Sequence, residues 1–186
     1  MYMPTVKSAS SADLKQVVNT LVLAFVNGTF GRFMGPDANH YMKSRIIFEA
    51  MAVGSIDTGA AYLAYNTDEV CGAASLWFPP GEKPPEDAMM AALGEAVFPQ
   101  RQEPVARVFE TMKSFHPEEP HWYLAVLGAD AHFQSLGLDA TLLKHTLEIC
   151  DSSQNISIYE LHGFEIMDEI RIGDCPVLTQ MLRPAR

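Results

Sequence analysis

The chain has 186 residues, a length that favours one domain over residues 1–186 with room for a sizeable core. Hydrophobic residues make up 48% and charged residues 19%, as in ordinary soluble globular proteins. The net charge is −10 without any basic run, which argues against nucleic acid or an anionic membrane as a partner and suits a cationic substrate. Since no stretch has membrane-spanning length and we expect no signal peptide, a cytoplasmic location is predicted.

Three scattered cysteines, Cys71, Cys150 and Cys175, cannot all pair with one another. Reduced thiols in the cytoplasm are the simplest interpretation. No set of His, Cys, Asp and Glu residues has the spacing of metal ligands, so we expect no metal.

Hydrophobic periodicity and turn residues predict an alternation of strands and helices before the centre of the chain. The expected elements are a strand over 4–8, a helix that begins after Ser11 and ends at Asn27-Gly28, a loop over 29–37, a helix capped by Asp37, strands over 60–65 and 70–78, and helices over 86–97 and 104–115.

The loop over 29–37 carries Phe30, Phe33 and Met34 between glycines. These side chains either line an apolar pocket or fill the core beneath the loop, and the second interpretation is favoured.

The most informative stretch is 121–143, in which an apolar strand (122–127) is followed by a polar turn and a helical pattern. Leu138, Leu142, His145 and Ile149 lie along one side of that helix. Unpaired amides at a helix N-terminus can bind an anion, and Gly137 allows close backbone approach. Many α/β proteins have such a turn with no ligand in it.

Two motifs resemble a known family. Gln134, Gly137 and Asp139 resemble motif A, Gln/Arg-x-x-Gly-x-Gly/Ala, of the GNAT superfamily of acyl-CoA-dependent N-acyltransferases, except that Asp139 departs from the last position. Residues 155–164, NISIYELHGF, resemble motif B of that superfamily. The lead into motif A, residues 119–125, is similar to that of the puromycin N-acetyltransferase-like group.

The resemblance implies an α/β (α+β) fold with a mixed, mostly antiparallel central sheet flanked by helices, and a strand over 165–172. It also implies transfer of an acetyl group from acetyl-CoA to a primary amine of a small molecule, by direct attack in a ternary complex. In this family the cofactor is held mainly by backbone groups, here those of Leu127, Gly128, Ala129, Gln134, Ser135, Leu136, Gly137, Leu138, Asp139 and Ala140, together with Asn155.

Tyr159 matches the tyrosine that acts in the family as general acid toward the departing thiolate, and a phenol holds its proton at neutral pH. The general base is open. Tyr123 occupies the aligned strand position, His121 lies on the same strand face, and ordered water could also serve. The carboxylate of Asp139 either repels the pyrophosphate or turns outward to favour the helix dipole.

The segment after the helix that ends near Cys150 is about ten residues shorter than a family strand plus connection would require. Either 155–162 is the motif-B helix and the strand is lost, or 156–161 is the strand and the helix is lost. The alternative function is therefore a catalytically degenerate GNAT-like protein that binds CoA or a protein partner without turnover. A peptide acceptor is less favoured, and oligomeric state stays open, with a homodimer as one option.

Overall fold

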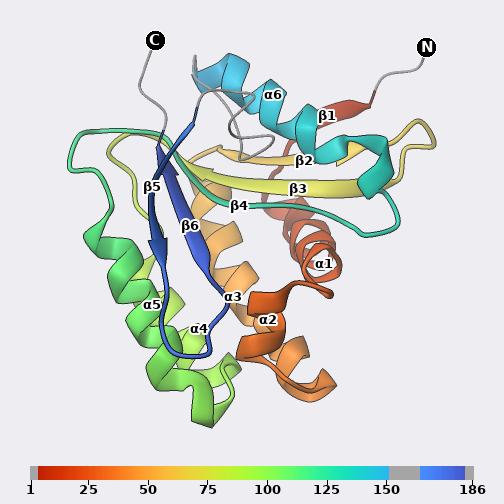
Figure 1. Cartoon of the computed structure of the whole chain (residues 1–186). Helices are drawn as coiled ribbons and strands as arrows, with labels where there is room; N and C mark the ends of the chain where they lie inside the picture. Colours follow the sequence, from red (N-terminus) through yellow and green to blue (C-terminus); the bar gives the residue numbers. More distant parts are fainter. Residues whose placement is uncertain (1–3, 151–163, 183–186) are drawn as a thin grey trace.

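The computed structural model describes residues 4–150 and 164–182 of the chain. Its strands form a four-stranded antiparallel sheet in the order β1-β2-β3-β4 and a separate hairpin, β5-β6 (Figure 1). The strands are β1 (Thr5–Ser8), β2 (Ala61–Tyr65), β3 (Cys71–Phe78), β4 (Tyr123–Ala129), β5 (Glu165–Ile170) and β6 (Leu178–Leu182). The helices are α1 (Leu14–Ala24), α2 (Thr29–Met34), α3 (Ala38–Asp57), α4 (Glu86–Ala96), α5 (Gln102–Ser114) and α6 (Leu138–Cys150), with 3-10 turns at η1 (Ser11–Asp13), η2 (Pro99–Arg101) and η3 (Gln134–Leu136).

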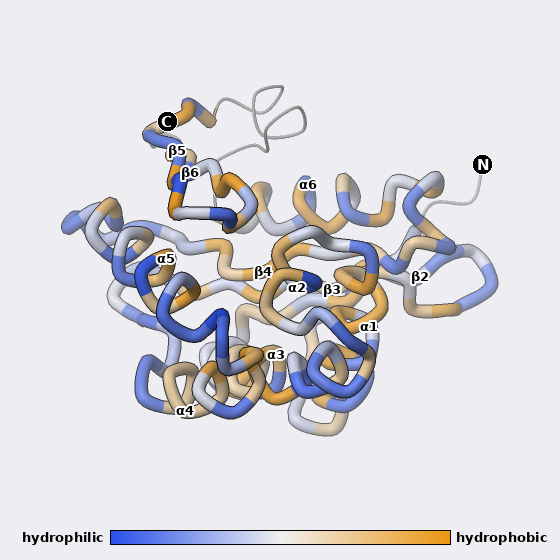
Figure 2. Tube along the Cα trace, turned by 60° about the horizontal axis from the view of Figure 1, so that its bottom comes forward, coloured by the Kyte–Doolittle hydropathy of each residue, from blue (hydrophilic) through white to orange (hydrophobic). Residues whose placement is uncertain are grey.

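The sheet lies between two layers of helices, with α6 over one face and α1 and α3 over the other (Figure 2). Successive residues of a strand point to opposite faces, so one strand contributes to two cores. In β2, Leu63 packs with the cluster under α1 and α3, whereas Tyr62 and Ala64 pack with Leu138 and Leu142 of α6. The central strands are therefore buried on both faces.

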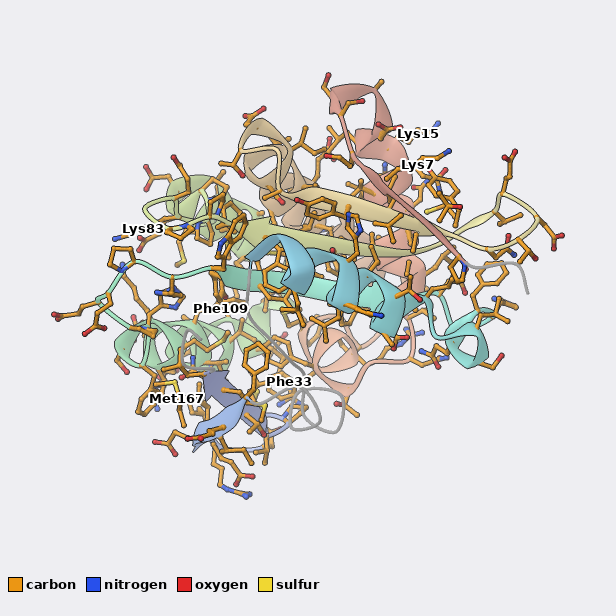
Figure 3. All side chains as sticks on the ribbon, turned by 90° about the horizontal axis from the view of Figure 1, so that it is seen from above. Lys7, Lys15, Phe33, Lys83, Phe109 and Met167 are labelled. Atoms are coloured by element: carbon orange, nitrogen blue, oxygen red, sulfur yellow. The ribbon has the colours of Figure 1, made fainter. Side chains whose placement is uncertain are left out.

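The hairpin lies beyond β4 and is not hydrogen-bonded to it as a strand neighbour (Figure 1). Its Ile170 and Cys175 form a third core with Val108 of α5, and Phe30 and Phe33 of α2 pack against this core. Figure 3 shows Phe33, Phe109 and Met167 gathered where these elements meet. The aromatic side chains near residue 30 thus fill a core.

The predicted fold class, a mostly antiparallel sheet flanked by helices, is confirmed. The predicted strands and helices reappear with shifts of a few residues at their ends; the central strand, for example, spans 123–129 instead of 122–127. Every strand pair among the described residues is antiparallel, and both the parallel strand of the family and the two registers proposed for 155–162 fall outside the described residues.

Two expectations were wrong or incomplete. Residues 29–34 form the helix α2 instead of a loop, because spacing Phe30 and Phe33 three residues apart on a helix turns both rings toward the hairpin core. Strand β6 was not predicted.

Among the described residues, we find no helix with the length and hydrophobicity needed to cross a membrane.

Candidate functional site

The turn that follows β4 is fixed by Asp130, whose carboxylate is largely buried. Its amide donates to the carbonyl of Gly72 in β3 (2.9 Å), and its Oδ1 accepts from the amide of His132 (3.0 Å). The amide of Phe133 donates to the Asp130 carbonyl (2.8 Å). An aspartate that accepts from the amide two residues ahead is a common way to start a tight turn. The chain therefore leaves the sheet in a defined direction, and His132 lies in this turn.

Gly137 separates η3 from α6 and has a left-handed backbone, with φ 64° and ψ 29°. A side chain is disfavoured at such a φ, so glycine is required here for conformational reasons. A Cβ added to Gly137 would meet no atom within 4 Å, so the space on that side of the turn is open. Together the two facts describe a turn that a ligand can approach closely.

The first turn of α6 carries amides that have no intrahelical acceptor. Asp139 takes up one of them, since its Oδ1 accepts from the amide of Ala140 (2.9 Å). The amide and hydroxyl of Thr141 both donate to the carbonyl of Gly137 (3.0 and 2.9 Å). The carboxylate of Asp139 therefore does not turn outward into solvent but sits at the helix N-terminus, where an anion would bind.

Two glycines let the helices approach the sheet at this place. A Cβ at Gly72 would lie 2.5 Å from Cδ1 of Leu138 and 2.8 Å from the ring of Phe133, so α6 and its turn rest directly on β3. A Cβ at Gly128 would lie 2.7 Å from Cβ of Ala24, so α1 rests directly on β4. Gly128 was predicted as a cofactor contact, which stays a prediction; in the structure it allows α1 to pack on β4.

The residues predicted to hold the cofactor lie in one region, at the end of β4 and the start of α6. Gln134, Ser135 and Leu136 are exposed, whereas Leu138 is fully buried. Within the described residues, β4 has a strand neighbour only on the β3 side. Asn155 and Tyr159 lie outside the described residues.

A cluster of rings stands at the other end of β4. Nδ1 of His121 lies 2.7 Å from the carbonyl oxygen of Glu119, and Nε2 of His121 lies 3.2 Å from Nε2 of His116. A carbonyl can only accept, so Nδ1 of His121 carries a proton and the Nε2 of the neutral ring faces His116 with its lone pair. The ring of His116 also meets the ring of Tyr123 edge to face, with 4.6 Å between centroids.

These neighbours shift the acidities of the cluster. Partial burial of the ring lowers the pKa of His116 below its ordinary value of 6.5, and the charges of His121 and Lys83 lower it further. Burial raises the pKa of the Tyr123 phenol, so this group stays protonated at neutral pH and is a poor base. The histidine pair is the better proton acceptor.

Sequence reasoning missed Gly72 and His116. A glycine inside a strand pattern is a known sign of close backbone approach, and that sign was present at Gly72. His116 gave no signal, because its proximity to His121 depends on how residues 116–121 fold back before β4. In the described part of the chain, no three His, Cys, Asp or Glu side chains are grouped so that they could hold a metal ion.

Comparison with solved structures identifies acetyltransferases with the same fold, although no family model matches the sequence. A protein from Corynebacterium glutamicum, described as histone acetyltransferase HPA2 and related acetyltransferase, is similar with 24% identity and a TM-score of 0.70 over 100% of this chain and 98% of its own. The polyamine N-acetyltransferase of Drosophila melanogaster, which forms N-acetylagmatine, shares 13% identity with a TM-score of 0.61 over 97% and 93%. A GNAT-family acetyltransferase from Streptococcus agalactiae shares 12% with a TM-score of 0.57 over 100% and 99%. At these identities the likeness establishes the fold.

Proposed function

We propose that residues 1–186 form one acyltransferase domain that moves an acetyl group from acetyl-CoA to a primary amine of a small molecule in the cytoplasm. The observation that carries the proposal is the end of β4. There, a strand edge that has no strand neighbour within residues 4–150 and 164–182 leads into a turn at Gly137 and then into the N-terminus of α6. An open strand edge offers amides and carbonyls to an extended chain, and a helix N-terminus offers amides to a phosphate.

The residues present fit such a cofactor. The pyrophosphate would bind the backbone amides from Gln134 to Ala140, next to the open space at Gly137. The backbone of Leu127–Ala129, at the end of β4, would hold the pantetheine arm. The His116–His121 pair lies at the other end of this seven-residue strand. The cofactor supplies the acetyl group as an activated thioester.

An amine as acceptor is supported by charge and by likeness. The net charge of −10 favours approach of a cation, and similar structures include enzymes that acetylate polyamines. A protonated amine cannot attack, so its proton must first pass to a group of the protein or to ordered water. We assign this role to the histidine pair, in which a proton taken up by either ring is shared with the other across 3.2 Å.

Tyr159 is proposed as the donor of a proton to the sulfur when the carbon–sulfur bond breaks, with Asn155 as a further cofactor contact. Direct attack by the amine is favoured over a cysteinyl intermediate. Cys71 is half-buried in β3, hydrogen-bonded to Thr20 and Ala73, and burial raises the pKa of its thiol. Cys175 is buried in the hairpin core, and burial raises its pKa as well. Neither thiol has the character of a nucleophile.

Calorimetric titration with acetyl-CoA tests the proposal first. We expect micromolar affinity, a loss of about tenfold in Gly137→Ala, and unchanged affinity in Gly94→Ala, an exposed helical glycine of α4 that serves as matched control. If neither acetyl-CoA nor CoA gave any heat of binding at millimolar concentration, the proposed cofactor site would be refuted.

Release of free CoA thiol from acetyl-CoA, measured with a panel of amines, then distinguishes a transferase from a protein that only binds CoA. Turnover that falls in Tyr159→Phe while acetyl-CoA affinity is kept supports the transferase. Tight acetyl-CoA binding without turnover on polyamines, arylalkylamines or peptides would favour the alternative, a degenerate protein that binds CoA. The position of Asp139 at the helix N-terminus is the observation that keeps this alternative open.

A further inference from the structure

A cavity lies between α1, α2 and α3, away from the end of β4. It has a volume of about 430 Å³ and an apolar lining from Val22, Leu23, Val26, Tyr41 and Met42. Leu23 and Met42 are 48% and 56% exposed, so the lining is open to solvent. A cavity of this size lined by apolar groups with a few polar ones is typical of a site for a small organic molecule.

Two arginines, Arg32 and Arg45, also line the cavity and differ from the other described arginines. Arg101, Arg107 and Arg171 are each paired with a carboxylate. The hydrogen-bond acceptors of Arg32 and Arg45 are neutral. Nε of Arg32 donates to the carbonyl of Val26 (2.8 Å), and Nη1 of Arg45 donates to Oδ1 of Asn19 (2.6 Å).

These contacts hold the two guanidinium groups in place without neutralising them. Each group has five N–H donors and uses one of them in these bonds. The Arg32 guanidinium also lies over the ring of Tyr41 at 4.6 Å, and the Tyr41 hydroxyl is fixed by donation to the Val22 carbonyl (2.6 Å). In a chain with a net charge of −10, this is a preorganised positive site beside an apolar surface.

We propose that this cavity binds an amphipathic carboxylate, with its hydrocarbon chain against α1 and α3 and its carboxylate on Arg32 and Arg45. Guanidinium groups match carboxylates in shape and charge, and the apolar lining excludes a ligand that is polar throughout. The carboxylate of Asp37, at the start of α3, already accepts from the amide and the ring of His40, so it is paired with His40 and not with either arginine.

The cavity is distinct from the proposed cofactor site. Helix α1 lies between the two, since Ala24 and Phe25 contact β4 at Gly128, whereas Leu23 and Val26 line the cavity. The inference therefore does not depend on the proposed function, and the two can fail separately.

Titration of the full chain with decanoate tests the inference, with decanol and acetate as probes that carry only the chain or only the charge. We expect saturable micromolar binding of decanoate and binding at least about tenfold weaker for the other two, as fits the loss of a charged hydrogen bond. Arg45→Gln should lose about tenfold for decanoate and little for decanol, and Arg45→Lys should recover part of the loss. Lys43→Gln removes the same charge from the same helix outside the cavity lining and should bind as the wild type does.

Equal affinities for decanol and decanoate, unchanged decanoate affinity in Arg45→Gln, or no saturation at millimolar decanoate would each overturn the inference. Thermal unfolding of Arg45→Gln and its titration with acetyl-CoA establish that the variant is folded and that any loss belongs to this cavity.

Discussion

At the scale of single residues, Gly137 and Gly94 form a matched pair, because neither would meet an atom within 4 Å if it gained a Cβ. Of these two glycines, Gly137 has a positive φ and Gly94 does not. Ala at 137 should lower the free energy of unfolding by about 1 kcal/mol, whereas Ala at 94, inside α4, should raise it by roughly 0.5–1 kcal/mol. Urea unfolding of both variants measures the difference. Equal effects would mean that the backbone at 137 is not left-handed.

The carboxylate of Asp139 occupies the amide of Ala140 and adds a negative charge where a pyrophosphate is proposed. Asn at this position can still accept from that amide but carries no charge. Asp139→Asn should therefore bind acetyl-CoA about fivefold more tightly, as expected for removal of a like-charge contact of about 1 kcal/mol. Calorimetry at two salt concentrations checks this prediction, because screening by salt should reduce the difference in affinity between the variant and the wild type. Weaker binding by the variant would place the phosphates elsewhere.

The histidine pair predicts a pH dependence for kcat/KM with amine substrates. The pair accepts a proton only when neutral, and the pKa of His116 is lowered from 6.5, so activity should rise with pH through the slightly acidic range. His121→Ala should lower kcat about a hundredfold and remove this limb of the profile. His132→Ala, at an exposed ring beyond the other end of β4, is the control. A profile unchanged in His121→Ala would leave ordered water as the base.

At the scale of elements, contact between α1 and β4 depends on the absence of a side chain at Gly128. Ala at this position would place its Cβ 2.7 Å from Cβ of Ala24 and should destabilise the fold by about 1–3 kcal/mol through overpacking. Ala24→Gly removes one of the two colliding groups. The double variant should recover part of the loss beyond additivity, which a double-mutant cycle of urea unfolding measures. Strict additivity would mean that the two atoms are not in contact.

The same elements show how far the sequence could predict the fold. Strands β2 and β3 and helices α3 and α6 were predictable, because apolar periodicity and capping residues such as Asp37 act locally. Helix α2 was not, because Gly31 lowers its helix propensity, and packing of Phe30 and Phe33 on a distant hairpin offsets this. The turn at Gly137 was predictable from its motif, whereas the contact between His116 and His121 depends on tertiary structure.

At the scale of the whole molecule, stability should fall on the acid side. The hydroxyl and amide of Ser10 lower the pKa of Asp13 from its ordinary 3.8, and the amide and ring of His40 lower that of Asp37. A carboxyl whose pKa is lower in the folded state stabilises the fold above its unfolded pKa, and the effect is lost as the pH falls through the folded pKa. Urea midpoints should therefore drop below about pH 4. Asp13→Asn should flatten this drop, and Asp57→Asn, which removes the same charge at the end of α3, should not.

The lowered pKa of His116 acts in the same direction at higher pH. Its neutral ring is favoured in the folded state, so its contribution is present above pH 6.5 and is lost as the pH falls through its lowered folded pKa. A small loss of stability in the weakly acidic range should therefore precede the larger one from the carboxyls. His116→Gln should remove the loss in the weakly acidic range and keep the larger loss from the carboxyls. If the urea midpoints of this variant still showed both losses as the pH falls, His116 would not be the group responsible for the first.

Gly72 of β3 and Gly128 of β4 lie close together, because each adjoins the pair formed by Ala73 and Ala129. They are packed against helices on opposite faces of the sheet. Leu138 reaches the sheet from above at Gly72, and Ala24 from below at Gly128. Helices α6 and α1 therefore pack directly on the backbone of the sheet, from its two faces, beside the turn at Gly137. In hydrogen–deuterium exchange, the backbone amides around the Ala73–Ala129 pair should therefore exchange last, after those of the hairpin and of the ends of β1.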